Sequence, residues 1–131
     1  MSTGFSQHVR NIIYSRSDYA GLPTCEINSQ CFLAPAVQIH HRRPRGMGGS
    51  KRLETNTASN GLATCERCHS YVESHRIEAL EKGWLVQQWA DPLTKPVQIR
   101  GHKVYLDDAG QKLADPFADN IQPLTEGVTN A

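Results

Sequence analysis

The sequence has 131 residues, of which 38% are hydrophobic and 21% are charged, and its net charge is +1. This length predicts one domain with a thin core, and such a domain often needs a metal ion or disulfides for stability. No apolar run approaches the roughly 20 residues of a membrane span, and the N-terminus lacks the layout of a signal peptide. We therefore expect a cytoplasmic protein with no membrane partner.

The charges are unevenly distributed along the chain. Five basic residues and one acid, Glu54, lie between Gln38 and Thr55, whereas five acids and one lysine occupy residues 107–131. This asymmetry predicts a basic working surface and an acidic tail, although solvated loops are the alternative at both places. Residues 107–131 also have few apolar anchors, so we expect them to be largely disordered.

Periodicity, cap residues and turn residues predict the elements in chain order. They are a helix over 7–19, a loop over 24–35, a strand over 36–40, a loop over 42–59, a strand over 61–64, a helix over 66–82 and a hairpin over 97–106. Ser6 can cap the first helix and Gly83 the end of the second. Gly101 is expected as the first residue of the two-residue hairpin turn. The corresponding divisions are an N-terminal helical segment at 1–24, a core at 25–83, a covering segment and hairpin at 84–106 and a flexible tail at 107–131.

The four cysteines form two close pairs, Cys25-x5-Cys31 and Cys65-x2-Cys68. Two such pairs fit a tetrahedral structural zinc that ties a loop to the start of a helix. Buried free thiols are one alternative, and disulfides in an oxidising compartment are the other. Because a reducing compartment is expected, zinc is the favoured interpretation.

His40 and His41 are adjacent at the end of a predicted strand. Neighbouring strand residues point to opposite faces, so one histidine could bind a metal while the other acts on a water or supports the fold. The basic residues that follow could anchor phosphates through charge-assisted contacts. These are Arg42, Arg43, Arg45, Lys51 and Arg52.

Two further patterns could carry chemistry. His69 and Glu73 stand four residues apart on the predicted helix 66–82, so both side chains can reach one ion. A surface polar face is the alternative for this pair. Asn60 precedes Gly61, which is ordinarily a turn signal, but its amide could also fix a loop or bind a metal.

Taken together, these residues resemble the HNH endonuclease family. The resemblance rests on His40-His41, then Gly48-Gly49, then Asn60 with Cys65-x2-Cys68-His69, in this order and at these spacings. It implies a small α+β domain of the ββα-metal, treble-clef-like type with a structural zinc, preceded by a helix and followed by a β-hairpin. The layout is similar to that of small phage-type HNH proteins associated with genome packaging, which would place the protein in the host cytoplasm.

The resemblance also implies a role for each matching residue. His41 corresponds to the general base, His40 and His69 to ligands of the catalytic ion, and Asn60 to the residue that positions the base-bearing loop and in some members binds the metal. Glu73 stands where a further ligand is usually histidine. This departure makes the site friendlier to magnesium or manganese than two imidazoles would, while nickel and zinc remain open.

The function implied is metal-dependent hydrolysis of phosphodiester bonds in double-stranded DNA, by nicking or double-strand cleavage. Terminase or other packaging proteins would be the protein partners. Two alternatives without catalysis remain open at this point. One is a zinc-stapled nucleic-acid-binding module, and the other is a scaffold of a packaging complex.

Overall fold

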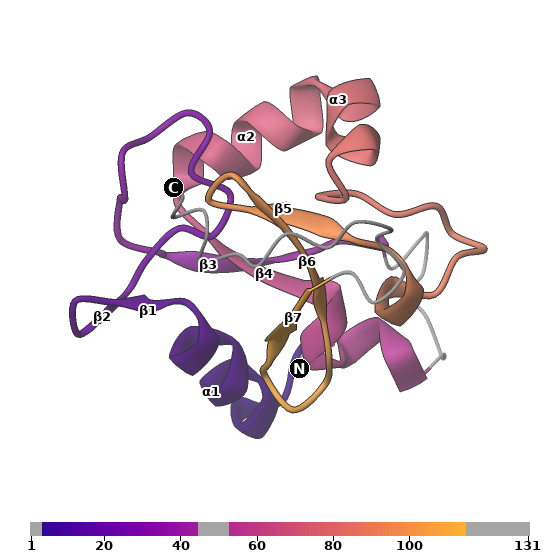
Figure 1. Ribbon diagram of the computed structural model, residues 1–131, viewed down its shortest axis with the longest axis horizontal. Helices are drawn as coiled ribbons and strands as arrows, with labels where there is room; N and C mark the ends of the chain where they lie inside the picture. The colour runs from indigo at the N-terminus through magenta and orange to yellow at the C-terminus, as the bar shows by residue number, and fades with distance from the viewer. Residues whose placement is uncertain (1–3, 45–52, 115–131) are drawn as a thin grey trace.

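A computed structural model describes residues 4–44 and 53–114 (Figure 1). Its helices are α1 (Gln7–Arg16), α2 (Glu66–Ser74) and α3 (Arg76–Glu81), and its short 3-10 segments are η1 (Leu53–Asn56), η2 (Ala58–Asn60) and η3 (Pro92–Thr94). Its strands are β1 (Asp18–Tyr19), β2 (Leu22–Pro23), β3 (Gln38–His41), β4 (Gly61–Thr64), β5 (Val97–Ile99), β6 (His102–Leu106) and β7 (Lys112–Leu113). The fold is a small mixed α/β arrangement of two two-stranded sheets, β1–β2 and β3–β4, and one three-stranded sheet, β5–β6–β7. None of the helices in the described ranges is both long and apolar enough to cross a bilayer.

The first helix has the predicted cap but a different end. The Ser6 hydroxyl accepts a hydrogen bond from the Val9 N–H, so the predicted cap is confirmed. The helix ends at Arg16 and not at residue 19. Ala20 and Gly21 both adopt positive φ angles, 55° and 88°, and this tight turn pairs β1 with β2.

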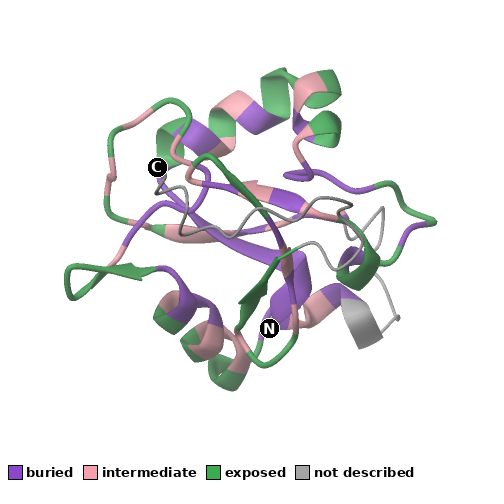
Figure 2. Cartoon of the chain, viewed as in Figure 1, coloured by how far each residue is buried: buried purple, intermediate pink, exposed green. Residues whose placement is uncertain are grey.

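The antiparallel β3–β4 pair lies at the centre of the molecule, with α1 on one side and α2 on the other (Figure 1). All four residues of β4 are buried (Figure 2). Leu62 packs into the larger core, whereas Ala63 packs with Ile13 and Phe5 on the side of α1. The strand predicted over 61–64 is confirmed. The strand predicted over 36–40 runs instead over 38–41, so His41 is inside it, opposite Gly61.

The helix predicted over 66–82 is two helices that meet at His75. The backbone of His75 leaves the helical region, with φ −128° and ψ 61°. Its ring stacks on Tyr71, one turn earlier, with the centroids 3.9 Å apart. Gly83 does end the second helix at a φ of +78°, as predicted. A Cβ at this position would lie 2.0 Å from the Pro96 carbonyl oxygen, so only glycine fits.

The C-terminal hairpin is confirmed, but its turn and its extent differ from the prediction. The two turn residues are Arg100 and Gly101, with φ angles of 48° and 87°, so glycine is the second and not the first of them. Both angles are positive, as a type I′ turn requires. The strand β7 then pairs with β6, so part of the region expected to be disordered is ordered. The rest of that prediction, on residues 115–131, lies outside the described part of the chain.

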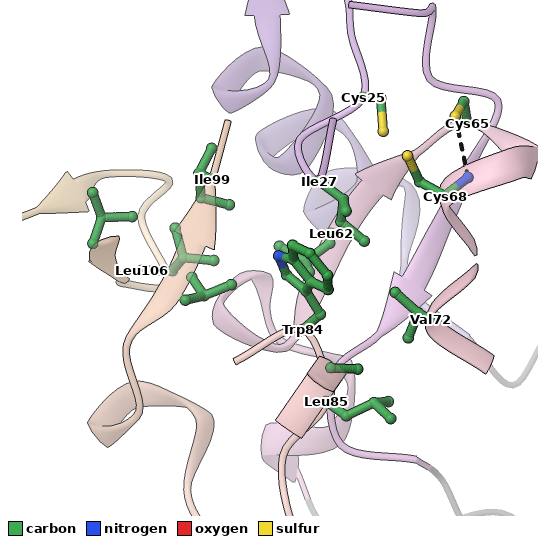
Figure 3. Close-up of a cluster of buried hydrophobic side chains, with 13 residues drawn as sticks. Cys25, Ile27, Leu62, Cys65, Cys68, Val72, Trp84, Leu85, Ile99 and Leu106 are labelled. Atoms are coloured by element: carbon green, nitrogen blue, oxygen red, sulfur yellow. Dashed lines mark hydrogen bonds between the residues drawn. The ribbon is translucent and has the colours of Figure 1, made fainter. Parts of the chain in front are cut away.

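Trp84 occupies the middle of the larger core (Figure 3). Its side chain is 1% exposed and lies among Leu62, Ile99 and Leu106, and its indole N–H donates to the Gln98 carbonyl at 2.7 Å. An indole buried with its single donor satisfied joins β4 to the β5–β6 hairpin without an unpaired polar atom.

A buried ion pair joins α1 to the β3–β4 pair. The guanidinium of Arg16 makes two 2.7 Å hydrogen bonds to the carboxylate of Glu26, and both side chains are fully buried. Arg16 also donates to the Ala58 and Gly61 carbonyls, and Glu26 accepts from the Ala63 N–H. Because the remaining donors and acceptors are satisfied, this pair is of the kind that a small core tolerates.

Candidate metal centres

The four cysteines converge at the junction of the loop after β2 and the start of α2. Their sulfur atoms all lie within 4.8 Å of one another, and no disulfide joins them. Cys65 is the N-cap of α2 and Cys68 lies in its first turn, while the other two sit in the loop. Figure 3 shows Cys25, Cys65 and Cys68 turned toward one another at the edge of the core. This cluster could hold a metal ion, as the spacing of the cysteines predicted.

Backbone N–H groups surround the sulfur atoms. The N–H groups of Asn28, Gln30 and Cys68 donate to Cys25, Cys68 and Cys65 respectively, at 3.3 to 3.4 Å. Donors aimed at sulfur favour the thiolate, which is the form that binds a metal.

Burial has the opposite effect on two of the thiols. It raises the pKa of Cys25 strongly and that of Cys31 to about 11. Burial also acts to raise the pKa of Cys68, but N–H donors from Gln30 and Ser29 and the neighbouring thiols lower it overall. One thiol with a lowered pKa beside two thiols whose pKa burial raises fits a site in which a bound cation would favour the thiolate forms.

A second cluster lies about one helical turn further along α2. His40 from β3 and His69 and Glu73 from α2 place their ligand atoms within 4.8 Å of one another. The two imidazole rings meet edge to face with centroids 5.3 Å apart, and His69 Nε2 lies 3.8 Å from a Glu73 carboxylate oxygen. The structure therefore brings together the three residues predicted to hold the catalytic ion.

His40 is held as a neutral ring with a defined tautomer. Its Nε2 lies 2.8 Å from the Trp84 carbonyl oxygen, which can only accept, so Nε2 carries the proton and Nδ1 carries the lone pair. Burial, at 4% exposure, lowers the pKa of His40 to about 4, with a smaller effect from His69. A neutral imidazole with an oriented lone pair is a competent metal ligand.

His41 lies next to this cluster and is held by different partners. Its ring stacks on Phe5 with the centroids 4.3 Å apart, and its Nε2 lies 2.9 Å from the Asn56 side-chain oxygen. Because that oxygen accepts, the proton is on Nε2 and the lone pair is on Nδ1. A cavity of about 350 Å³ is lined by both adjacent histidines, His69, Glu73 and Arg76, among others. The arrangement places a potential base and potential metal ligands on one cavity.

Asn60 fixes the backbone around this cavity. It is fully buried, and its amide oxygen accepts from the Arg43 N–H at 2.7 Å. Its amide nitrogen donates to the Thr55 and Arg43 carbonyls at 2.8 and 3.3 Å. The amide oxygen and nitrogen of Asn60 thus link Arg43, which follows β3, to Thr55 in η1. This geometry supports a positioning role and not metal ligation.

The phosphate-binding role predicted for Arg42 and Arg43 is wrong. The side chains are 0% and 2% exposed. The Arg42 guanidinium donates to the carbonyls of Ser59, Gly83, Pro92 and Lys95, and that of Arg43 to the Ala90 carbonyl and the Thr55 hydroxyl. Both arginines therefore connect loops inside the protein. The other predicted phosphate ligands, Arg45, Lys51 and Arg52, lie outside the described residues.

Three residues of this region were not predicted from the sequence. Asn56 and Phe5 contact His41 from positions far apart in the chain, and no local pattern marks either of them. Arg76 was detectable in principle, because it stands three residues after Glu73, within one helical turn.

Comparison of the chain with protein-family models, with curated proteins and with solved structures finds no match.

Proposed function

We propose that this chain is a metal-dependent endonuclease of the HNH type, which hydrolyses phosphodiester bonds in double-stranded DNA. One observation carries the proposal: His40, His41, His69 and Glu73 line the same cavity. Three potential metal ligands and one potential base on one cavity can together support hydrolysis of a phosphodiester with one metal ion.

Each cluster would hold its own ion. The four cysteines form a closed, all-sulfur ligand set that suits a structural zinc. Two imidazoles and a carboxylate at the cavity suit Mn²⁺, Ni²⁺ or Zn²⁺, and the carboxylate makes Mg²⁺ acceptable. When bound there, a divalent ion supplies positive charge to the scissile phosphate and to the leaving oxygen.

His41 would act as the general base. The contact between Nε2 and Asn56 places the ring lone pair on Nδ1, so Nδ1 would take the proton of the attacking water. The stack on Phe5 fixes the plane of the ring. Asn60 holds the backbone immediately after this histidine, so the residue expected to orient the base acts through the loop, while Asn56 contacts the ring.

His40 and Trp84 explain why the metal-binding histidine would keep its orientation during turnover. The hydrogen bond from Nε2 to the Trp84 carbonyl fixes the ring beside His69 and Glu73 and leaves the Nδ1 lone pair available for a metal. The ring is buried, so its position is set by packing and not by the incoming DNA. A ligand of this kind needs no reorganisation when substrate binds.

The test is a nicking assay on supercoiled plasmid with Mg²⁺, Mn²⁺, Ni²⁺ or Zn²⁺ added in turn. The wild-type chain is expected to nick with at least one ion and to stop when that ion is withheld. His41→Ala should lose about 10²- to 10⁴-fold in rate, while it keeps the far-UV circular dichroism spectrum and the metal affinity of the wild type.

Near-normal nicking by His41→Ala would refute the assignment of the base. Salt-sensitive DNA binding with no nicking under any ion would identify a binding module, and co-purification with packaging proteins without cleavage would identify a scaffold. Glu73→Ala tests the third ligand, since unchanged affinity for the added ion in calorimetry would remove Glu73 from the set.

A further inference from the structure

Arg42 and Arg43 are buried, but another arginine lines the cavity formed by the histidines and Glu73. Arg76, the first residue of α3, lines the cavity together with His40, His41, His69 and Glu73. Its side chain is 53% exposed, in contrast to the fully buried Arg42. It is thus a cation that solvent and a ligand in the cavity can both reach.

Glu73 connects Arg76 to the potential metal ligands. One carboxylate oxygen lies 3.8 Å from His69 Nε2, and the other lies 3.4 Å from an Arg76 guanidinium nitrogen. The carboxylate therefore faces the metal cluster with one oxygen and the arginine with the other. A guanidinium has five N–H donors, and this single long contact to Glu73 engages one of its nitrogens.

We propose that Arg76 is a phosphate-binding residue of the cavity, which Glu73 positions while it also serves the metal cluster. The inference rests on the proposed function for the identity of its ligand, a DNA phosphate. The guanidinium geometry matches two phosphate oxygens at once. A phosphate in the cavity would then lie between the cation of α3 and the imidazoles of β3 and α2.

The bend at His75 makes this placement possible. It separates α2, which carries His69 and Glu73, from α3, which begins with Arg76. A solvent-exposed pair of Glu73 with Arg76 would contribute little to stability by itself. The position on the cavity wall is therefore better explained by binding than by folding.

The inference predicts opposite effects of Arg76→Ala on two ligands. Removal of a cation beside the cluster should leave affinity for Mn²⁺ equal to that of the wild type or higher, because like charges repel. Affinity for DNA should fall about tenfold, and the slope of log K against log salt concentration should become shallower by about 1. A purely structural residue would change both affinities in the same direction.

The experiment measures binding of a short duplex DNA over a salt series in a His41→Ala background, so that the DNA is not cut. Arg67→Ala is the matched control. Arg67 is an exposed arginine of α2 that donates to the Gln30 carbonyl beside the cysteine cluster, and its loss changes net charge equally. Arg76→Lys should recover part of the affinity, because the charge remains while the forked donors are lost. Mn²⁺ affinity of each variant is measured by calorimetry.

A selective loss of DNA affinity in Arg76→Ala, with Mn²⁺ binding retained, supports the inference. Equal DNA affinities of Arg76→Ala and Arg67→Ala overturn it, even where the chain with His41 intact nicks plasmid. If the chain with His41 intact fails to nick plasmid with every ion tested, the endonuclease proposal fails. The DNA-binding role of Arg76 is then decided by the binding data alone.

Discussion

Arg42→Met removes a guanidinium group that donates to four backbone carbonyl oxygens from three separate segments of the chain. The acceptors are Ser59, Gly83, Pro92 and Lys95, at 2.8, 2.8, 3.2 and 3.0 Å. A hydrogen bond to a charged group contributes about 1.5 to 3 kcal/mol. Burial of the charge offsets part of this sum, and it lowers the pKa of Arg42 to about 9, with a further effect from Arg16. The group is still charged at pH 7.

The expected loss of unfolding free energy is about 3 to 5 kcal/mol, the usual cost of breaking a buried charged network. A domain of this size has about 5 to 15 kcal/mol in total, so the variant would be folded only marginally. In urea, where unfolding free energy falls by about 1 to 3 kcal/mol per molar, the midpoint should drop by roughly 2 M. Arg42→Lys should recover little, since an ammonium cannot span the same acceptors.

The assay is urea unfolding followed by far-UV circular dichroism, with Arg67→Met as the control. Arg67 is exposed, so its substitution should change the free energy by no more than about 0.5 kcal/mol. An Arg42→Met variant with wild-type stability and weakened DNA binding would refute the buried role and restore the phosphate-binding interpretation.

Three further predictions concern stability. Removal by a chelator of the metal proposed at the cysteine cluster, or Cys68→Ala, should abolish cooperative unfolding seen by circular dichroism. A folded, metal-free chain would contradict the proposed structural role. Glu26→Gln leaves the Arg16 charge buried without its carboxylate and should lower the free energy of unfolding in urea by about 3 to 5 kcal/mol. The double variant Arg16→Met/Glu26→Leu should recover part of this loss, and a loss below about 1 kcal/mol in Glu26→Gln would count against the ion pair. The folded pKa of His40, about 4, lies below its ordinary value of 6.5, so the unfolded chain gains a proton first as the pH falls. The stability of the wild type relative to His40→Gln should therefore decrease between pH 6.5 and 4, by roughly 3 kcal/mol in all, and a difference independent of pH would refute the buried neutral ring.

The features that could be predicted from the sequence depend on short spacings. Cys65 and Cys68, or His69 and Glu73, are neighbours on any helix that contains them, so helical geometry alone places them together. Gly83 was predictable for the same reason, since a left-handed residue after a helix is a local requirement. The two clusters were found because each has at least two ligands on one element.

The environment of the arginines could not be predicted in this way. A run of basic residues after a strand indicates a surface, because free guanidinium groups are rarely buried. The acceptors of the buried Arg42 guanidinium are backbone carbonyls up to 53 positions away. Every residue type has a backbone carbonyl, so the sequence does not show which of them accept. The break at His75 was missed for a related reason, as no helix-breaking residue stands there and the contact of its ring with Tyr71 is not marked by residue type. Asn56 contacts the His41 ring from 15 positions away in the chain, a separation at which no local pattern marks the partner.

The stack of Phe5 on His41 limits how far the chain could be shortened from its N-terminal side without loss of support for His41. The sequence suggests that the smallest active unit begins near Cys25, where the cysteine pairs start. Yet Phe5 lies before α1 and forms one wall against the proposed base, and Gly61, opposite that base, has no room for a side chain because Phe5 and Ile13 fill the space. A shortened version that keeps every cysteine and histidine of both clusters but lacks the first helix would have both metal sites and an unsupported base. Any shortened chain meant to keep the proposed nuclease activity should therefore start before Phe5.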